Sequence, residues 1–387
     1  MLENVLLGDV AKIDRNLVAP ENIETGSIYV GLENVESGGR LINVGTVVNG
    51  ELASSKFRFT SKHVLYGKLR PYLAKIALPE FDGICSTDIL PVLPGPKLDR
   101  RYLVHFLRQP NKVQLANSLA TGVNLPRLSP KALEKMTVPL PPLDEQRRVA
   151  AILDAVDELR MKSSKALVYL EALAQSLFDS MVRNPERLMP ATTLADLGLR
   201  FSSGKNLVSV DGDAHEHNRV IKVNAVSGGV FQPAESKPLP RSYVPNEQHR
   251  IRSGDLLFTR ASGSLDLIGI CVRVGVVDEQ LFLPDKIWRA EFAPGARVCP
   301  EYLQSLFKTP SFRAFVNNAA SGAAGVKNIS QRSVLGFVVN APDPAAQADF
   351  ARAFTAIELV KERYRCQLVE LDSLFASLEQ RAFSGVL

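Results

Sequence analysis

Two stretches in the first half of the chain carry many cations and no acid. One lies between Glu51 and Glu80, and the other lies between Asp99 and Glu134. Cations without neighbouring acids are what a phosphate-facing surface needs, because each neutralised phosphate releases condensed counterions. An ordinary solvated face with its acids elsewhere gives the same pattern, so charge alone leaves both interpretations open. The candidate contact residues in and around these stretches are Lys68, Arg70, Tyr72, Lys75, Asn124 and Arg127.

A similar arrangement returns in the second half of the chain. Residues 256–260 match residues 64–68, so that Arg260 corresponds to Lys68, and a loop of small residues follows at 261–264. No acid lies between Glu301 and Asp343. The polar residues differ between the copies, which predicts two modules of one scaffold that recognise different short targets. Asn and Arg side chains can make bidentate contacts to base edges. The candidate contact residues of the second copy are Arg260, Ser262, Ser264, Lys327, Asn328 and Gln331.

The whole chain is organised as two copies. Gln146 and Gln347 each follow a proline-bearing loop and open a helix, and the same offset relates Pro141 to Pro342. The leucines of the two helices keep this offset, which predicts a tandem duplication of a globular module followed by a long helix. The predicted parts are a first globular domain at 1–143, a first spacer helix at 144–184, a second globular domain at 185–342 and a second spacer helix at 343–387.

Each long helix carries a heptad-spaced seam typical of a coiled coil. We expect Asp144 to cap the first helix, and Asn184 with Pro185 to end it. Each helix has one apolar side and needs one long partner, so we expect the two to pair, antiparallel if the copies are related by a rough twofold axis. The expected seams are Val149, Ile152, Val156, Leu159, Ser163, Ala166, Leu170, Leu173 and Leu177, and Phe350, Ala353, Ile357, Val360, Tyr364, Gln367, Leu371, Leu374 and Leu378.

Strands and short helices are expected inside the globular domains. Residues 102–119 have helical periodicity, which Pro110 divides in two, and Ser129 with Pro130 suits the start of another helix. The predicted fold class is therefore α+β, with two similar α/β domains separated by two long antiparallel helices that form a coiled coil. The expected strands include residues 27–32, 44–48, 84–92, 220–226, 268–277 and 287–292.

Composition and motifs argue against several classes of protein. A net charge of +5 and 45% hydrophobic residues suit an ordinary globular chain with a mild preference for anions. The four cysteines are far apart in sequence, which favours reduced thiols in a cytoplasmic protein over a metal knuckle or redox pair. We expect no signal peptide and no membrane-spanning segment. No P-loop, nucleotide fingerprint, amino-methylating motif or convincing metal site is found, so no catalytic residue and no cofactor is expected in this chain.

Four segments resemble a known family. PLPPLDEQRRVAAILDAVDEL, from Pro139, and LDSLFASLEQRAFSG, from Leu371, resemble the helix junction and the C-terminal helix of type I restriction-modification specificity subunits. VLYGKLRPYLAKIA, from Val64, and GDLLFTRASGS, from Gly254, resemble the target-recognition strands and loops of that family. The similarity covers nearly the whole chain, twice, in the order recognition domain, spacer helix, recognition domain, spacer helix.

The resemblance implies a non-catalytic, sequence-specific DNA-binding subunit. Each recognition domain would bind half of a split, asymmetric site in double-stranded DNA, and the helices would set the distance between the halves. The helices would also dock two methyltransferase subunits, which bring S-adenosylmethionine and flip an adenine, and restriction subunits that use ATP and magnesium could join. Two other hypotheses remain at this point: a stand-alone DNA-modifying enzyme, and a helical scaffold that binds only proteins.

Overall fold

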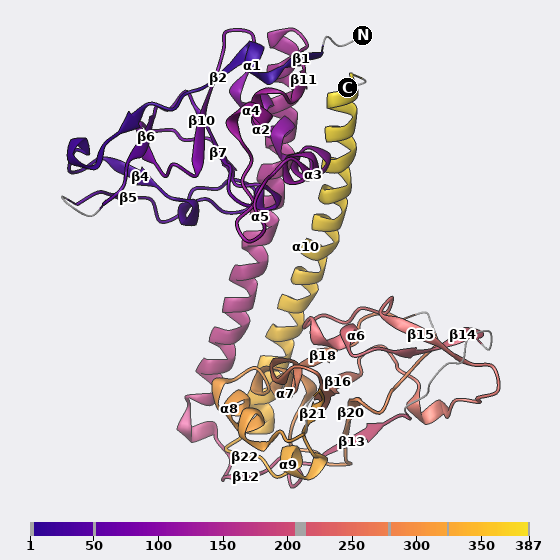
Figure 1. Cartoon of the computed structure of the whole chain (residues 1–387). Helices are drawn as coiled ribbons and strands as arrows, with labels where there is room; N and C mark the ends of the chain where they lie inside the picture. Colours follow the sequence, from indigo (N-terminus) through magenta and orange to yellow (C-terminus); the bar gives the residue numbers. More distant parts are fainter. Residues whose placement is uncertain (1–3, 49–51, 206–213, 278–279, 323–324, 386–387) are drawn as a thin grey trace. The chain divides into compact units, whose positions relative to one another are not determined.

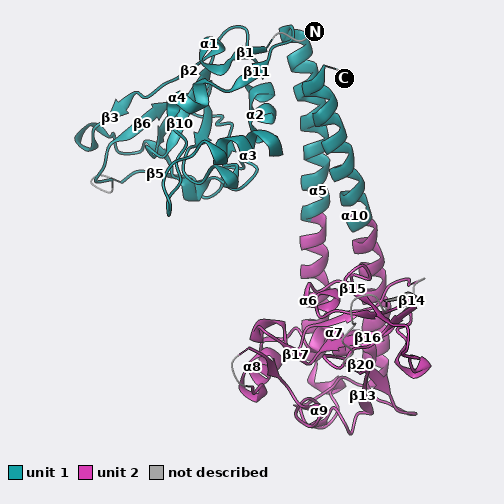
Figure 2. Ribbon diagram, turned by 45° about the vertical axis from the view of Figure 1, so that its right-hand side comes forward, with its two compact units in different colours: residues 1–165, 365–387 teal, residues 166–364 magenta. Residues whose placement is uncertain are grey.

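The computed structural model describes residues 4–48, 52–205, 214–277, 280–322 and 325–385 (Figure 1). It contains two compact units, coloured separately in Figure 2. Unit 1 comprises residues 1–165 and 365–387, and unit 2 comprises residues 166–364. Two long helices, α5 (Leu143–Val182) and α10 (Pro344–Ser384), contribute one part each to both units.

Unit 1 places a four-stranded antiparallel sheet, in the order β2-β10-β7-β8, beside a five-stranded sheet, in the order β3-β6-β9-β4-β5. A two-stranded ribbon of β1 and β11 pairs the start of the globular part with its end. The strands are β1 (Asn4–Leu6), β2 (Ala11–Ile13), β3 (Leu17–Val18), β4 (Ile28–Val30), β5 (Gly45–Thr46), β6 (Lys56–Phe59), β7 (Val64–Gly67), β8 (Ile76–Ala77), β9 (Gly83–Cys85), β10 (Ile89–Pro94) and β11 (Thr137–Pro139). The helices are α1 (Leu7–Val10), η1 (Pro20–Asn22), η2 (Leu32–Asn34), η3 (Pro71–Leu73), α2 (Arg100–Arg108), α3 (Pro110–Ser118) and α4 (Pro130–Glu134).

Helix α2 joins the four-stranded sheet of unit 1 to the long helices. The Asp99 carboxylate caps its start by accepting from the N–H groups of Arg101 and Tyr102. Its apolar face is buried, and the rings of Tyr102 and Phe106 lie 5.0 and 5.7 Å from the ring of Phe383 in α10. Burial of these large side chains stabilises the contact between α2 and α10.

Unit 2 repeats the four-stranded sheet, in the order β13-β20-β16-β18, and adds a three-stranded sheet, β15-β14-β19. Two ribbons complete it, β12 with β22 and β17 with β21. The strands are β12 (Thr192–Thr193), β13 (Leu199–Ser203), β14 (Ala214–Ile221), β15 (Ser236–Pro240), β16 (Leu256–Thr259), β17 (Ala261–Ser262), β18 (Cys271–Arg273), β19 (Gln280–Phe282), β20 (Ile287–Phe292), β21 (Lys327–Asn328) and β22 (Val338–Val339). The helices are η4 (Pro185–Arg187), α6 (Asn224–Ser227), η5 (Glu247–His249), η6 (Leu265–Leu267), α7 (Pro300–Leu306), α8 (Pro310–Ala319) and α9 (Gln331–Leu335).

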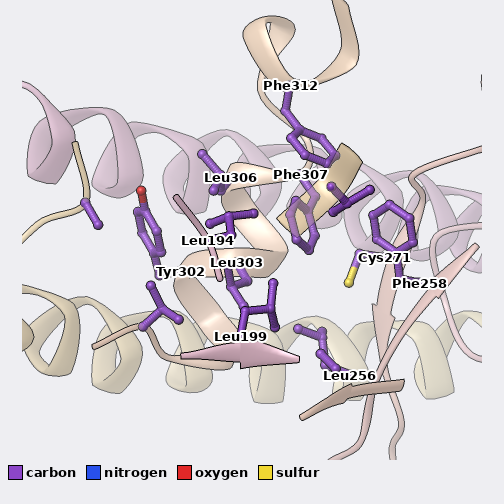
Figure 3. Close-up of a cluster of buried hydrophobic side chains, with 14 of the residues drawn as sticks. Leu194, Leu199, Leu256, Phe258, Cys271, Tyr302, Leu303, Leu306, Phe307 and Phe312 are labelled. Atoms are coloured by element: carbon purple, nitrogen blue, oxygen red, sulfur yellow. The ribbon is translucent and has the colours of Figure 1, made fainter. Parts of the chain in front are cut away.

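An aromatic cluster forms the core of unit 2. Figure 3 shows Phe258 of β16 near Phe307 and Phe312 of the α7–α8 region. Phe258 stacks on Trp288 of β20 at a centroid distance of 5.7 Å, and its ring meets Phe307 edge-on at 5.2 Å. Such ring pairs add to the hydrophobic stabilisation from burial alone.

The structure confirms the predicted internal repeat, and two buried glutamines show it most clearly. Gln146 of α5 accepts a hydrogen bond from the N–H of Asp99 and donates to the carbonyls of Lys97 and Pro141. Gln347 of α10 makes the same three bonds, accepting from Cys299 N–H and donating to the Arg297 and Pro342 carbonyls. In each copy this side chain ties the start of a long helix to the cap of a shorter one.

The expected coiled-coil seam is only half right. In both helices one of the two alternating heptad positions matches, as at Val149 and Ile357, which are buried. The other is rotated off the interface: Leu159 and Leu173 are 45% and 48% exposed. Buried or half-buried residues at Leu153, Arg160, Leu167 and Ala174, and at Phe354, Lys361, Leu368 and Phe375, take their place.

Two charged residues, Arg160 and Lys361, occupy equivalent positions in the observed helix–helix interface. In unit 1 Arg160 hydrogen-bonds Asp372 at 2.7 Å and lies 4.8 Å from the ring of Phe375. In unit 2 Lys361, which is buried, bonds Glu171 of the opposite helix. Arg160 and Lys361 differ by 201 residues, as do Glu171 and Asp372, so the two ion pairs are copies of one another. Within each unit the helix segments therefore run antiparallel in one register.

Several local predictions are confirmed and others are wrong. Helices α2 and α3 divide at Pro110, Ser129 caps α4, and β20 spans residues 287–292 as predicted. Residues 84–92 do not form one strand, because the chain turns between β9 and β10. Residues 220–226 divide between β14 and α6, and only Cys271–Arg273 of residues 268–277 is a strand. Helix α5 begins at Leu143, so Asp144 lies in its first turn instead of capping it.

Candidate nucleic-acid interface

In unit 1 a strained basic loop follows the central strand β7. Arg70 and Ala74 both have left-handed backbones, with φ of 52° and 47°, and they flank the turn η3. Non-glycine residues in this conformation cost free energy, and such strain concentrates at functional sites. The loop exposes Arg70 and Tyr72, whereas the Lys75 ammonium donates to the Leu32 carbonyl at 2.7 Å and is engaged inside the domain.

A second loop, residues 121–127, is fastened to the first by backbone hydrogen bonds. Arg70 N–H donates to the Pro126 carbonyl at 2.7 Å, and Leu128 N–H donates to the Lys68 carbonyl at 2.9 Å. Thr121 and Arg127 exchange two further bonds across the loop. The loop thereby presents Asn124, which is exposed, beside the basic loop.

A carboxylate joins the cations of the two loops. Asp88 Oδ1 and Oδ2 accept from Arg127 Nε and Nη2 at 3.0 and 3.3 Å, and Asp88 Oδ1 lies 3.7 Å from Lys68 Nζ. The hydrogen bond to Asp88 raises the pKa of Arg127 above its ordinary value. The structure thus brings together Lys68, Arg70, Asn124 and Arg127, and it adds Asp88.

Asp88 is absent from the predicted contact residues because the sequence predicts one continuous strand over residues 84–92. The segment Ser86, Thr87 and Asp88 interrupts an apolar run with three small polar residues, which is the composition of a turn. In the structure this turn separates β9 from β10 and places Asp88 beside the loops.

Unit 2 builds the matching site with other side chains. The ribbon of β17 and β21 pairs Ala261 with Asn328 and Ser262 with Lys327, so the two candidate loops are adjacent. Lys327 and Ser264 are exposed and Gln331 is half-buried at the start of α9. The Ser262 hydroxyl is buried and accepts from Ser264 N–H at 3.3 Å, so it is used within the loop.

Arg260 holds the position of Lys68 but in a different environment. Its guanidinium lies 5.8 Å from the ring centre of Trp288, within the range of a cation–π contact. Among the residues that the structure describes, its Nε is buried without a hydrogen-bond partner. A buried donor without a partner is costly, so this arginine is suited to receive a ligand acceptor.

Two further features bear on the alternatives. Within the described ranges no three His, Cys, Asp or Glu side chains gather closely enough to hold a metal ion. In the same ranges, no helix combines the length and apolar character that crossing a bilayer requires.

Comparisons with known proteins find similar chains of one kind. The profile of the type I restriction modification DNA specificity domain matches residues 2–168. The EcoKI specificity subunit of Escherichia coli K12 is 27% identical over 310 residues, covering 74% of this chain and 65% of its own length. The StySPI specificity subunit of Salmonella potsdam is 20% identical and is covered to 67%. The chain therefore spans about two thirds of these relatives.

Solved structures share the fold. The type I restriction-modification S subunit from M. genitalium aligns over 99% of this chain and 96% of its own, with a TM-score of 0.65 and 13% identity. A chain from a study of complex assembly in the type I restriction-modification system aligns over 100% and 98%, with a TM-score of 0.54 and 20% identity. The predicted architecture of two α/β domains with long helices is confirmed by these likenesses.

Proposed function

We propose that the chain belongs to the type I restriction-modification specificity family, whose domain profile matches residues 2–168, and that it is the DNA-recognising subunit of such a system. Each globular domain, 1–143 and 185–342, serves as a target-recognition domain for one half of a split, asymmetric site in double-stranded DNA. The helices, 144–184 and 343–387, serve as spacers and set the number of base pairs between the halves.

One observation carries this proposal. The two copies keep the same four-stranded sheet and the same backbone bonds behind the loops, yet the side chains presented by the loops differ. A shared scaffold with different presented side chains is what two readers of different sequences require, since base contacts specify and the scaffold only positions them. A protein that binds only other proteins has no need of cations at equivalent places in both copies.

The proposal extends to partners by analogy with the relatives. Two methyltransferase subunits would dock on the helices and supply S-adenosylmethionine, and restriction subunits would supply ATP-driven cleavage with magnesium. This chain would contribute no catalytic group. Its own role would be to bind DNA, orient the partners on it and remain in the cytoplasm with them.

Selection from a pool of random DNA duplexes tests the function directly. The full chain should enrich a motif of two short defined sequences separated by a fixed gap. Addition of seven residues to α5 after Ser164 should change the gap and leave both half-sequences intact, since the insertion adds about two helical turns. Recovery of no motif, or binding that is insensitive to salt, would favour a protein-binding scaffold.

A matched pair of variants tests the interface. Arg70→Ala removes an exposed cation from the loop, whereas Lys75→Ala removes one that is bonded to the Leu32 carbonyl. If Arg70 meets a phosphate, its loss should reduce the slope of log affinity against log salt by about 0.9, and the loss at Lys75 should leave the slope unchanged. Equal slopes for Arg70→Ala and the wild type would remove Arg70 from the interface. Modification of DNA by the isolated chain with S-adenosylmethionine or ATP would contradict the non-catalytic role.

A further inference from the structure

Asp88 lies between two of the cations proposed to face DNA. Its carboxylate is 26% exposed and sits 3.0 Å from Arg127 Nε and 3.7 Å from Lys68 Nζ. A carboxylate at a phosphate-binding surface weakens binding, because it repels the backbone and neutralises a cation. Its presence among the loops therefore needs a reason other than affinity.

The geometry of the Arg127 pair supplies that reason. Asp88 engages the Nε and Nη2 edge of the guanidinium with both of its oxygens. This side-on arrangement leaves the Nη1 and Nη2 edge of the fork available, and that edge can donate two parallel hydrogen bonds. The backbone of Arg127 is fixed as well, by two bonds to Thr121 and a bridge to Leu69. The side chain is 43% exposed, so a ligand can reach it.

The second copy changes both members of this pair. Lys68 N–H donates to the Asp88 carbonyl at 2.9 Å, and Arg260 N–H donates to the Lys286 carbonyl at 3.0 Å, so Lys286 takes the place of Asp88. Asn328 takes the place of Arg127, since it exchanges the same pair of bonds with Ser321 that Arg127 exchanges with Thr121. The acid is absent where the arginine is absent. The second copy therefore differs at both positions, while the backbone hydrogen bonds around them are the same.

We propose that Asp88 is a positioning residue for base recognition, which holds Arg127 so that its free edge donates to O6 and N7 of a guanine in the half-site read by the first domain. This inference rests on the proposed function and specifies its chemistry. Asp88 also offsets one positive charge, so that Arg127 does not bind any nearby phosphate indiscriminately. Arginine with guanine is the bidentate pair that the major groove favours, and such a pair discriminates by about 5- to 150-fold between bases.

The test compares Asp88→Asn with Glu80→Gln in the full chain. Both variants remove one negative charge from unit 1, but Glu80 is exposed and lies outside the two loops. Each protein is used to select from random duplexes, and its affinity for a fixed duplex of unrelated sequence is measured over a range of salt. Thermal unfolding verifies that each variant folds, and Asp88→Ala repeats the measurement without the amide.

The expected result has opposite signs for the two kinds of binding. Asp88→Asn should bind the unrelated duplex several-fold more tightly, with a steeper salt slope, and should lose the guanine preference in one half-site only. The other half-site and the gap should be unchanged, and Glu80→Gln should keep the wild-type motif. A merely structural role for Asp88 would weaken binding to all duplexes together.

Two outcomes overturn the inference in distinguishable ways. A wild-type chain that enriches no split motif overturns the proposed function and this inference with it. A wild-type chain that enriches a motif, with Asp88→Asn enriching the same motif at the same strength, overturns the role of Asp88 alone. The role of Asp88 alone is also overturned if the half-site selected by the wild-type chain contains no guanine. It is overturned as well if both Asp88 variants bind all duplexes more weakly.

Discussion

Replacement of Gln347 by alanine should measure how firmly a long helix is anchored to its globular domain. The Gln347 side chain is 2% exposed and makes three hydrogen bonds to backbone groups, at 3.0, 2.8 and 2.7 Å. Each such bond contributes about 1 kcal/mol net, and a buried N–H left without a partner costs about 1–3 kcal/mol. Gln347→Ala should therefore lower the free energy of unfolding by about 3 kcal/mol, or the melting temperature of unit 2 by roughly 6–12 °C.

Trp288 makes this measurable. It is the only tryptophan of the chain and lies buried in unit 2, so its fluorescence follows the unfolding of that unit during heating. Thr355→Ala is the control, because Thr355 is exposed on the same helix within unit 2 and its loss should change stability by less than about 0.5 kcal/mol. Gln347→Glu should be at least as harmful at neutral pH, since a carboxylate cannot donate to the Arg297 and Pro342 carbonyls. A loss below about 1 kcal/mol for Gln347→Ala, relative to the control, would refute the anchoring role.

Three further predictions concern charged groups. Burial opposes ionisation of Glu171, but hydrogen bonds from Lys308 and Lys361 outweigh it and hold its pKa at about 2, below the ordinary 4.5. Its stabilising contribution is thus present above pH 4.5 and lost as the pH falls toward 2, and Lys361→Met should flatten acid-unfolding curves in that window; an unchanged curve would contradict this. Burial raises the pKa of Glu379 to about 7, against the lowering effect of Arg160, so stability should fall as the pH rises from 4.5 through 7. Glu379→Gln should remove that fall in a melting series, and persistence of the fall would exclude Glu379 as its source. Finally, Arg127→Lys keeps the charge but not the planar fork, so selection experiments should show weaker discrimination in one half-site with an unchanged salt slope. Discrimination equal to that of the wild type would exclude a bidentate contact between Arg127 and a base.

The architecture could be predicted from the sequence, because the two copies have matching residues at a nearly constant offset. Such matches can be recognised without knowing how the side chains pack. The equivalence of Gln146 and Gln347 was visible as an offset, and it corresponds to identical hydrogen bonds in the structure. The position of the basic loops also followed from matching residues 64–68 to residues 256–260. These features depend on residue type and order, which the sequence contains directly.

The rotation of the helices could not be predicted in the same way. Two heptad phases share Val149 and Val156, and the phase through Leu159 and Leu173 contains no charged residue. The structure uses the other phase, which passes through Arg160, because Asp157 of the same helix, Asp372 of the opposite helix and the Phe375 ring all contact the guanidinium. A charge at a helix–helix interface is unfavourable unless a partner on the other helix balances it. The partner of Arg160 is Asp372, which lies more than 200 residues away in the sequence. The pattern of the first helix alone therefore does not indicate that Arg160 can face the second.

The candidate interface was incomplete for a related reason. Asp88 belongs to the interface because its carboxylate lies close to Arg127 and Lys68. The spacing of these residues in the sequence does not predict that they are close. The loop residues themselves were found because they are basic and recur. Their partner was an acid inside an apolar run, where pattern reasoning favours a continuous strand.

The small ribbons of β1 with β11 and β12 with β22 have a consequence for engineering. Leu6 pairs with Thr137, and Thr193 pairs with Val338, so each globular domain begins and ends at one spot. A domain with adjoining ends behaves as a cassette: it can be cut out and replaced by another of different length without the flanking helix having to move. Chimeras joined within these ribbons should therefore fold more readily than chimeras joined inside the sheets, and each should inherit the half-site preference of the donor domain.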